Sequence, residues 1–241
     1  MSNYRFEGLL QKEGWIIPAF VETDKKGSIT YLSSLPQPET TYEEVTGYAL
    51  PGFQNAHSHA FQYAMAGVAE RKEPGASSDD FWSWRETMYQ IALTLDPDQL
   101  EDVASMLYAE MLRHGYTHVA EFHYLHHDKN GVPFKNISEM GERLVRAAQK
   151  TGIKITLVPM FYQKGGFGMD PQPRQRRFIS STTEDYLELL TASKQSINLY
   201  DGANYGFGIH SLRAVAPEEI KSTLQGLQEQ IPVHIHIAEQ L

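Results

Sequence analysis

The chain has 241 residues, of which 41% are hydrophobic, enough for one large core or for a small domain beside a larger one. Its formal net charge of -9 argues against a nucleic-acid-binding surface, although small anionic ligands stay possible. Because there are 0 cysteines, disulfides are excluded and any metal site must use histidine and carboxylate ligands.

The first fifty residues are predicted to form a small β domain, part of a β-sandwich (residues 1–50). Residues 14–34 are typical of two short strands joined by a Lys-Lys-Gly turn. Residues 35–47, which contain two prolines, are predicted to form a loop. This part of the chain therefore differs in pattern from everything after it.

From residue 48 onward, apolar strand-like runs alternate with segments whose apolar residues recur every three or four positions. Such alternation is typical of a parallel sheet, either open or closed into a TIM barrel. The predicted strands are 48–59, 117–127, 153–163, 204–212 and 232–240, and the predicted helices are 98–115, 138–152, 183–197 and 217–230.

Each predicted strand has a polar side chain at or near its carboxyl end. In a TIM barrel these ends converge on one pocket, whereas an open sheet gathers ligands mainly at one switch point, so the pattern favours the barrel. A complete barrel needs eight strands. We therefore predict an α/β fold in which residues 51–241 form about five units of an incomplete TIM-type barrel. The strand-end residues are His57, His59, Tyr124, Gln163, His210 and His236.

Two of these strand ends are rich in histidine. His57 and His59 are two residues apart, so on a strand both imidazoles point to the same side and could bind one metal ion. A pair of rim histidines with ordinary hydrogen bonds is the alternative. In the last strand His236 is the better ligand candidate, because His234 lies one layer deeper, where we expect a hydrogen-bonded core histidine.

Glu239 follows His236 by three residues. Catalytic zinc keeps an open position for water, and a nearby carboxylate can take the water's proton and pass it to a departing nitrogen. A solvated loop glutamate is the alternative reading of this spacing.

Two further segments carry weaker signals. Residues 165–168 (GGFG) and 174–177 (RQRR) are predicted to form a mobile, basic loop over the pocket rather than a phosphate-binding turn. His126 and His127 are adjacent and would point apart on a strand, so we predict a hydrogen-bonded loop there rather than a second metal cluster.

Several longer segments resemble a known family. "PGFQNAHSH" together with "HIHIAEQ" resembles the amidohydrolase superfamily in its deaminase branch. Within it, "DDFWSWRETMY", "VAEFHYLHHD", "GGFGMDPQPRQRRF" and "GIHSLRAV" are similar to the formimidoylglutamate deiminases of histidine degradation. The resemblance implies zinc-dependent hydrolysis of N-formimidoyl-L-glutamate, a dicarboxylate, to N-formyl-L-glutamate and ammonia.

The resemblance also implies roles for individual residues. It makes three histidines the zinc ligands, with a glutamate as proton shuttle and a fourth histidine in catalysis. Guanidinium groups bind carboxylates through paired hydrogen bonds, which suits two arginines to a dicarboxylate, although each could be a surface arginine. The implied ligands are His57, His59 and His236, the catalytic residues Glu239 and His210, and the substrate contacts Gln62, Arg85, Tyr124, His210 and Arg213.

The sequence departs from that family in one respect. The superfamily's deaminases also have a histidine after the sixth strand and a metal-binding aspartate after the eighth, whereas this chain ends after the fifth predicted strand. We therefore expect the N-terminal half of such a protein, lacking the aspartate ligand and of doubtful activity. The alternatives are an aminohydrolase of a heterocyclic ring and a non-catalytic half-barrel.

The expected partners follow from the same features. No segment approaches the ~20 apolar residues that cross a bilayer, and no secretion signal begins the chain, so we expect a cytoplasmic protein without membrane contact. Exposed strand edges on an open half-barrel would allow a homodimer.

Overall fold

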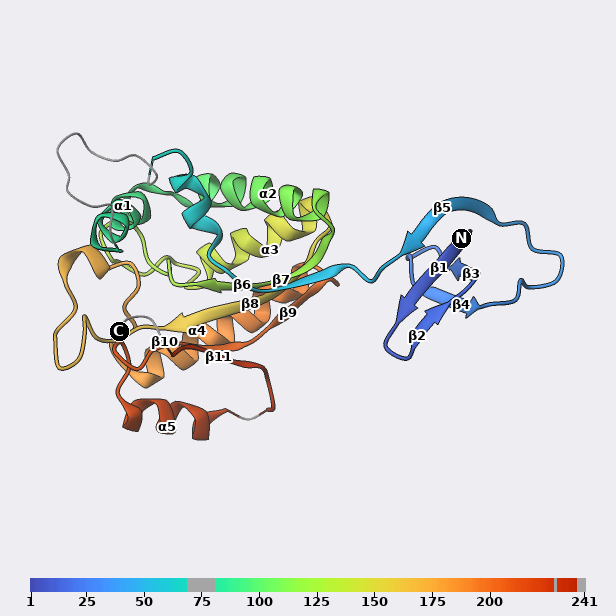
Figure 1. Cartoon of the computed structure of the whole chain (residues 1–241). Helices are drawn as coiled ribbons and strands as arrows, with labels where there is room; N and C mark the ends of the chain where they lie inside the picture. The colour runs from blue at the N-terminus through green and yellow to red at the C-terminus, as the bar shows by residue number, and fades with distance from the viewer. Residues whose placement is uncertain (69–80, 228, 238–241) are drawn as a thin grey trace. The chain divides into compact units, whose positions relative to one another are not determined.

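The structure is a computed structural model of the chain, and it describes residues 1–68, 81–227 and 229–237 (Figure 1). The chain divides into two compact units, Met1–Gly52 and Phe53–Leu241. The first contains the small sheet, and the second contains the parallel strands that bear the candidate site residues.

The first unit is one five-stranded sheet in the order β2-β1-β3-β4, with β5 paired in parallel to β1. The turn after β3 forms because Asp24 Oδ1 accepts hydrogen bonds from the N–H groups of Lys26 and Ser28. The predicted loop at 35–47 is wrong in its second half, because β5 begins at Glu43. The strands are β1 (Ser2–Gln11), β2 (Gly14–Ile16), β3 (Ala19–Thr23), β4 (Ile29–Ser33) and β5 (Glu43–Ala49).

The second unit contains a sheet in the order β11-β10-β8-β7-β6, with β9 also paired to β8. Every pair in it is parallel, so the carboxyl ends of these strands lie at one edge. The strands are β6 (Phe53–Ser58), β7 (Tyr116–His123), β8 (Lys154–Phe161), β9 (Ala203–Tyr205), β10 (Phe207–Ser211) and β11 (Val233–His236).

Helices connect these strands and cover the sheet. In Figure 1, α2 and α3 lie above the strands and α4 and α5 below them. Helix α2 begins with a capping box between Asp96 and Gln99, and α3 ends at Gly152, whose φ of 87° is left-handed. The α-helices are α1 (Phe81–Thr94), α2 (Pro97–Arg113), α3 (Glu139–Thr151), α4 (Thr183–Ser196) and α5 (Pro217–Gly226), and short 3-10 turns occupy Ala60–Met65, Pro173–Gln175 and Ile197–Leu199.

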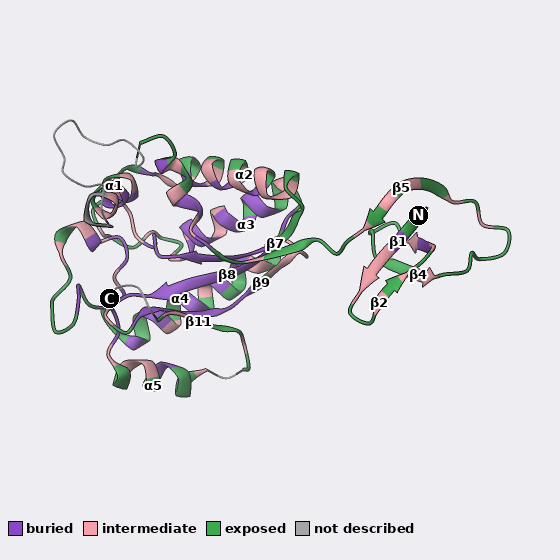
Figure 2. Cartoon of the chain, viewed as in Figure 1, coloured by how far each residue is buried: buried purple, intermediate pink, exposed green. Residues whose placement is uncertain are grey.

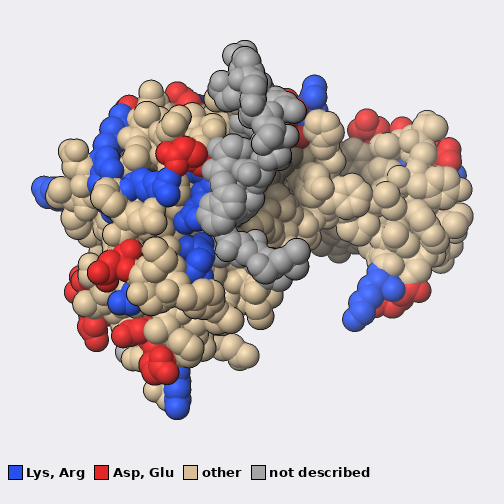
Figure 3. Space-filling model, turned by 60° about the vertical axis from the view of Figure 1, so that its left-hand side comes forward, with Lys and Arg blue, Asp and Glu red and all other residues tan. Residues whose placement is uncertain are grey.

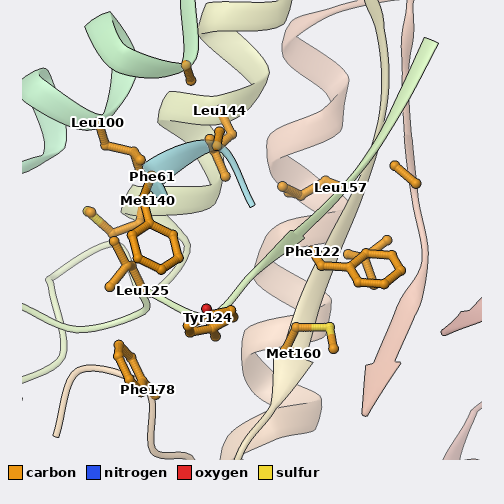
Figure 4. Close-up of a cluster of buried hydrophobic side chains, with 14 of the residues drawn as sticks. Phe61, Leu100, Phe122, Tyr124, Leu125, Met140, Leu144, Leu157, Met160 and Phe178 are labelled. Atoms are coloured by element: carbon orange, nitrogen blue, oxygen red, sulfur yellow. The ribbon is translucent and has the colours of Figure 1, made fainter. Parts of the chain in front are cut away.

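The core lies between the central strands and their helices. Strand β8 is buried from Ile155 to Phe161, as the continuous purple of Figure 2 shows, because a central parallel strand is covered on both faces. Figure 4 shows Leu100 of α2, Met140 and Leu144 of α3 and Leu157 of β8 among the side chains of this core. Packing of this kind fixes the strand ends that carry the site.

The predicted alternation of strands and helices is present, but several predicted bounds are wrong. The predicted strand at 48–59 contains the end of β5 and the whole of β6, which are separated by residues 50–52. The predicted strand at 204–212 is two strands, since β9 pairs with the start of β8 and β10 with its end. Helix α5 ends at Gly226 rather than at residue 230, and α1 was not predicted. Among the described residues, no helix is long and apolar enough to span a membrane.

Candidate functional site

Three histidines meet at the carboxyl edge of the parallel sheet. The candidate ligand atoms of His57, His59 and His236 all lie within 4.8 Å of one another, and His57 Nε2 is 3.3 Å from His236 Nε2. His57 belongs to β6 and His236 to β11, which are the two outermost strands in the sheet order. Because these outer strands approach so closely, the sheet must be curled, as in a partly closed barrel.

Two of the three imidazoles are oriented by backbone carbonyls. His59 Nδ1 lies 2.7 Å from the carbonyl oxygen of Phe122, and His236 Nδ1 lies 2.8 Å from that of His210. A carbonyl only accepts hydrogen bonds, so each Nδ1 carries the proton and each Nε2 presents a lone pair, the form in which an imidazole binds a metal. This arrangement fits a divalent metal that prefers imidazole ligands.

The surroundings of His57 and His59 favour their neutral forms. Burial lowers the pKa of His59 to about 3, against a weaker opposite effect of its hydrogen bond to Phe122. Burial, together with the neighbouring histidines His236 and His234, also lowers the pKa of His57. A metal ligand must be deprotonated at the binding nitrogen, so the cluster is ready to bind a cation at neutral pH.

A buried carboxyl group supports the strand end that carries His57 and His59. Glu121 of β7 is 1% exposed, and its Oε1 accepts a hydrogen bond of 2.5 Å from the backbone N–H of Ala60. Burial raises the pKa of Glu121 to about 7. Sequence reasoning missed this residue, although a glutamate inside an otherwise apolar strand run is a signal for such a role.

A cavity of about 180 Å³ lies beside the histidine cluster. It is bounded by aromatic rings and by two guanidinium groups, and its described lining contains no carboxylate. Figure 3, in which the left-hand side of Figure 1 comes forward, shows Lys and Arg side chains on this face interspersed with Asp and Glu. The lining residues are His59, Gln62, Trp84, Arg85, Met88, Tyr89, Tyr124, Tyr162, Phe178, His210, Arg213 and His236.

The cavity brings together all five residues that the resemblance implied for substrate contact. Gln62 Nε2 donates a 3.0 Å hydrogen bond to the hydroxyl of Tyr124, whose ring lies against that of His210. Arg85 reaches the cavity from α1, and Arg213 from the turn after β10. Glu239 lies outside the described residues.

Other predicted residues fall elsewhere. Gln163 is buried and its Nε2 donates to the carbonyl oxygen of Ser181, so it does not line the cavity. His234 is not part of the cluster, as expected, but it is half-buried beside Phe122 and its Nε2 has no hydrogen-bond partner among the described residues, so the prediction of a hydrogen-bonded core histidine is wrong. His126 and His127 bond through Nε2 to the carbonyl oxygens of Met160 and Ile179, as expected for a hydrogen-bonded loop.

The segment predicted to be a mobile, basic loop has a different structure. Gln175 and Arg177 are fully buried in it, each hydrogen-bonded to surrounding groups. Tyr89 and Tyr162 also line the cavity and were missed, because nothing in the spacing of a tyrosine distinguishes a cavity wall from a core. Tyr162 is the second-last residue of the predicted strand 153–163, and this place near a strand end is the signal that could have found it.

Comparison with known proteins places the chain among hydrolases. Residues 48–241 match the Amidohydrolase family. The whole chain is 44% identical to a formimidoylglutamate deiminase of Pseudomonas aeruginosa and covers 52% of that protein. It therefore spans about half the length of this curated relative.

Solved structures give the same picture of the fold. The crystal structure of an amidohydrolase from Brucella melitensis superposes with a TM-score of 0.90 at 41% identity, covering 100% of this chain and 52% of that one. An atrazine chlorohydrolase from Arthrobacter aurescens, crystallised with zinc, superposes with a TM-score of 0.77 at 18% identity, covering 100% and 54%. The second likeness concerns the fold alone.

Proposed function

Because the chain belongs to the amidohydrolase family, we propose that it supplies the metal and substrate sites of a zinc-dependent iminohydrolase. The proposed reaction converts N-formimidoyl-L-glutamate and water to N-formyl-L-glutamate and ammonia, in keeping with the formimidoylglutamate deiminase to which the chain is similar. Since the chain spans about half of that relative, the activity is proposed for a complete barrel. We expect residues 1–241 alone to show no detectable turnover.

The observation that carries this proposal is the pairing of two arginines with the histidine cluster. Arg85 and Arg213 line the same cavity as His59 and His236. A dicarboxylate needs cationic hydrogen-bond donors in its binding site. A guanidinium group suits this task because it can donate two parallel hydrogen bonds to one carboxylate. A neutral heterocyclic ring has no carboxylate that either guanidinium group could bind.

The proposed roles follow from position. His57, His59 and His236 would hold the zinc ion, which supplies Lewis acidity for hydrolysis of a C=N bond. His210, buried against Tyr124 and Tyr162, would orient the formimino group from the cavity wall.

Proton transfer is assigned to Glu239 by the family resemblance. Its carboxylate would take a proton from the attacking water and deliver it to the leaving nitrogen, which departs as ammonia when the C–N bond breaks. Gln62 would contact the substrate beside Tyr124, to which it is hydrogen-bonded.

Ammonia release tests the proposal. Zinc and N-formimidoyl-L-glutamate are supplied to the 241-residue chain and to a chimera in which it is followed by the second half of the Pseudomonas aeruginosa deiminase. We expect turnover by the chimera only. In the chimera, Arg213→Met should lower kcat/KM by a factor that corresponds to about 2–4 kcal/mol. A surface control, Arg146→Met, should match the parent, because Arg146 bonds to Glu142 on α3.

Two results would contradict this proposal. The first is a folded, zinc-loaded chimera that deaminates a purine or triazine ring but not the dicarboxylate. The second is an unchanged kcat/KM in Arg213→Met, which would remove the assigned role of the guanidinium group.

A further inference from the structure

The two cavity arginines are joined through one buried glutamine. Arg85 donates from Nε and NH2 to the hydroxyl oxygen of Tyr89, at 3.1 and 2.9 Å, and Arg213 donates from NH1 to that of Tyr162, at 3.2 Å. Gln175 Nε2 lies 3.2 Å from the Tyr89 hydroxyl and 2.9 Å from the Tyr162 hydroxyl. One amide group therefore links both arginine–tyrosine pairs.

The orientation of this amide is fixed. Gln175 Oε1 accepts a 2.7 Å hydrogen bond from the backbone N–H of Gln172, which only donates. The nitrogen must then face the two tyrosines, whose hydroxyl oxygens are its two nearer acceptors, while the carbonyl oxygen of Gly165 is a longer contact at 3.5 Å. Gln175 is 0% exposed and does not line the cavity, so it acts on a ligand only through its neighbours.

The hydrogen-bond capacity of the tyrosines determines where their own protons point. A phenolic oxygen has two lone pairs and one hydrogen. In Tyr162 one lone pair accepts from Arg213 and the other from Gln175, and in Tyr89 the Nε and NH2 groups of Arg85 share one side of the oxygen while Gln175 takes the other. The remaining hydrogen of each must be donated to another acceptor, and both side chains line the cavity.

We infer that Gln175 is a positioning residue that sets the cavity's preference for dicarboxylates, by presenting Arg85 with Tyr89 and Arg213 with Tyr162 as one array of donors. A ligand with one carboxylate would bind only some of these donors. The remaining donors would lose their hydrogen bonds to water and gain none from the ligand, which weakens binding. Burial raises the pKa of Tyr162, so its hydroxyl keeps the proton that it donates. The inference rests on the proposed function for the identity of the ligand.

Binding measurements on the 241-residue chain test the role of Gln175 without any turnover. Isothermal titration compares N-formyl-L-glutamate, a dicarboxylate, with N-formylglycine, which has one carboxylate. We expect the chain to prefer the dicarboxylate, and we expect Gln175→Leu to reduce the ratio of the two affinities at least tenfold. Gln175→Glu should reduce it further, because a carboxylate would accept the tyrosine protons and draw them away from the cavity.

Matched variants separate this role from a general loss of structure. Gln163→Leu removes another buried, hydrogen-bonded glutamine near the end of β8 and should leave the ratio unchanged. If Gln175→Leu does not fold, Tyr162→Phe, which deletes one of the donated protons, should lower the ratio in its place. A purely structural role would weaken both ligands equally and leave their ratio as it was.

The outcomes distinguish this inference from the proposed function. If folded Gln175 and Tyr162 variants keep the parent's ratio of dicarboxylate to monocarboxylate affinity, the inference is overturned. The proposed reaction would not be affected by that result, because it is tested by the ammonia-release assay. A chimera without turnover overturns the proposed reaction, whereas a Gln175-dependent preference for dicarboxylates would still support the donor array. If the parent chain binds neither ligand, the dicarboxylate assignment and this inference both fall.

Discussion

At the scale of single residues, the histidine cluster offers a direct comparison within one strand. His234 and His236 both belong to β11, but only His236 lies in the cluster with His57 and His59. We expect His236→Gln to lower zinc affinity at least tenfold, because a neutral imidazole ligand is lost. His234→Gln should change zinc affinity much less, as it removes a histidine from outside the cluster.

Competition with a chromophoric zinc chelator measures both affinities. The same preparations, followed by circular dichroism without metal, show whether either variant has lost structure. Equal zinc affinity in parent and His236→Gln would mean that the three histidines do not form the metal site.

A second residue-scale prediction concerns acid stability. His123 of β7 is 4% exposed, its ring lies 4.9 Å from that of His126, and burial lowers the pKa of His123 to about 4. Between about pH 4 and 6.5 the unfolded chain binds a proton at His123 that the folded chain does not. The free energy of unfolding therefore falls as the pH falls through this window, and the contribution of His123 is constant above it.

Urea denaturation at several pH values between 4.5 and 7.5 measures this slope. His123 contributes up to about 1.4 kcal/mol per pH unit, so His123→Gln should reduce the slope by a measurable part of that amount. The control is His114→Gln, which removes an exposed histidine at the end of α2. Identical slopes in parent and His123→Gln would show that His123 titrates normally in the folded state.

These residues also show where sequence reasoning succeeds. His57 and His59 could be paired from spacing alone, because alternate residues of a strand share a face. Glu121 and Gln175 could not be placed, because their partners, the Ala60 amide and two tyrosine hydroxyls, come from distant parts of the chain. Motif spacing records neighbours along the chain, whereas a buried hydrogen bond depends on the finished fold.

At the scale of elements, Arg177 ties the segment after β8 to the end of α1. It is fully buried, donates through NH1 to the carbonyl oxygens of Ala92 and Leu95, and donates through Nε to that of His127. Burial lowers the pKa of Arg177 to about 10, which leaves it charged at neutral pH. This contact stabilises the helix that carries Arg85.

We expect Arg177→Met to lower the free energy of unfolding by about 2–4 kcal/mol, because buried carbonyl groups lose their donors. The neighbouring Arg176→Met should change it by about 0.5 kcal/mol or less, since Arg176 is exposed where it bonds to the carbonyl oxygens of Lys129 and Pro173. Chemical denaturation of the two variants measures the difference. Equal stability would mean that the buried guanidinium group contributes nothing net to the fold.

The elements differ in how far sequence predicts them. Helices α2, α3 and α4 follow their apolar periodicity and begin and end within two residues of their predicted bounds. Most of strand β5 lies in the segment 35–47, which was assigned to a loop for its two prolines, although pairing with β1 stabilises the strand. The segment with Arg177 was taken for a mobile loop because its charges suggest solvent, and its carbonyl partners cannot be seen in the sequence.

At the scale of the whole molecule, the strand order leaves β11 and β6 at the two ends of the parallel sheet. Within the described residues β11 pairs only with β10, and its first residue, Val233, is 53% exposed. An unpaired strand edge with apolar side chains offers its N–H and C=O groups to another chain. We therefore propose that residues 1–241 self-associate through this edge.

Light scattering over a range of concentrations measures that association. Val233→Lys places a charge on the edge strand and should shift the chain toward monomer without lowering its thermal midpoint, because Val233 is not part of the core. Val132→Lys is the matched control: Val132 is 57% exposed but lies in the loop before α3, so its variant should associate as the parent does. A parent chain that stays monomeric at high concentration would contradict the proposal. Equal association in both variants would mean that the contact does not involve the edge of β11, because a charge placed on that edge would then have no effect of its own.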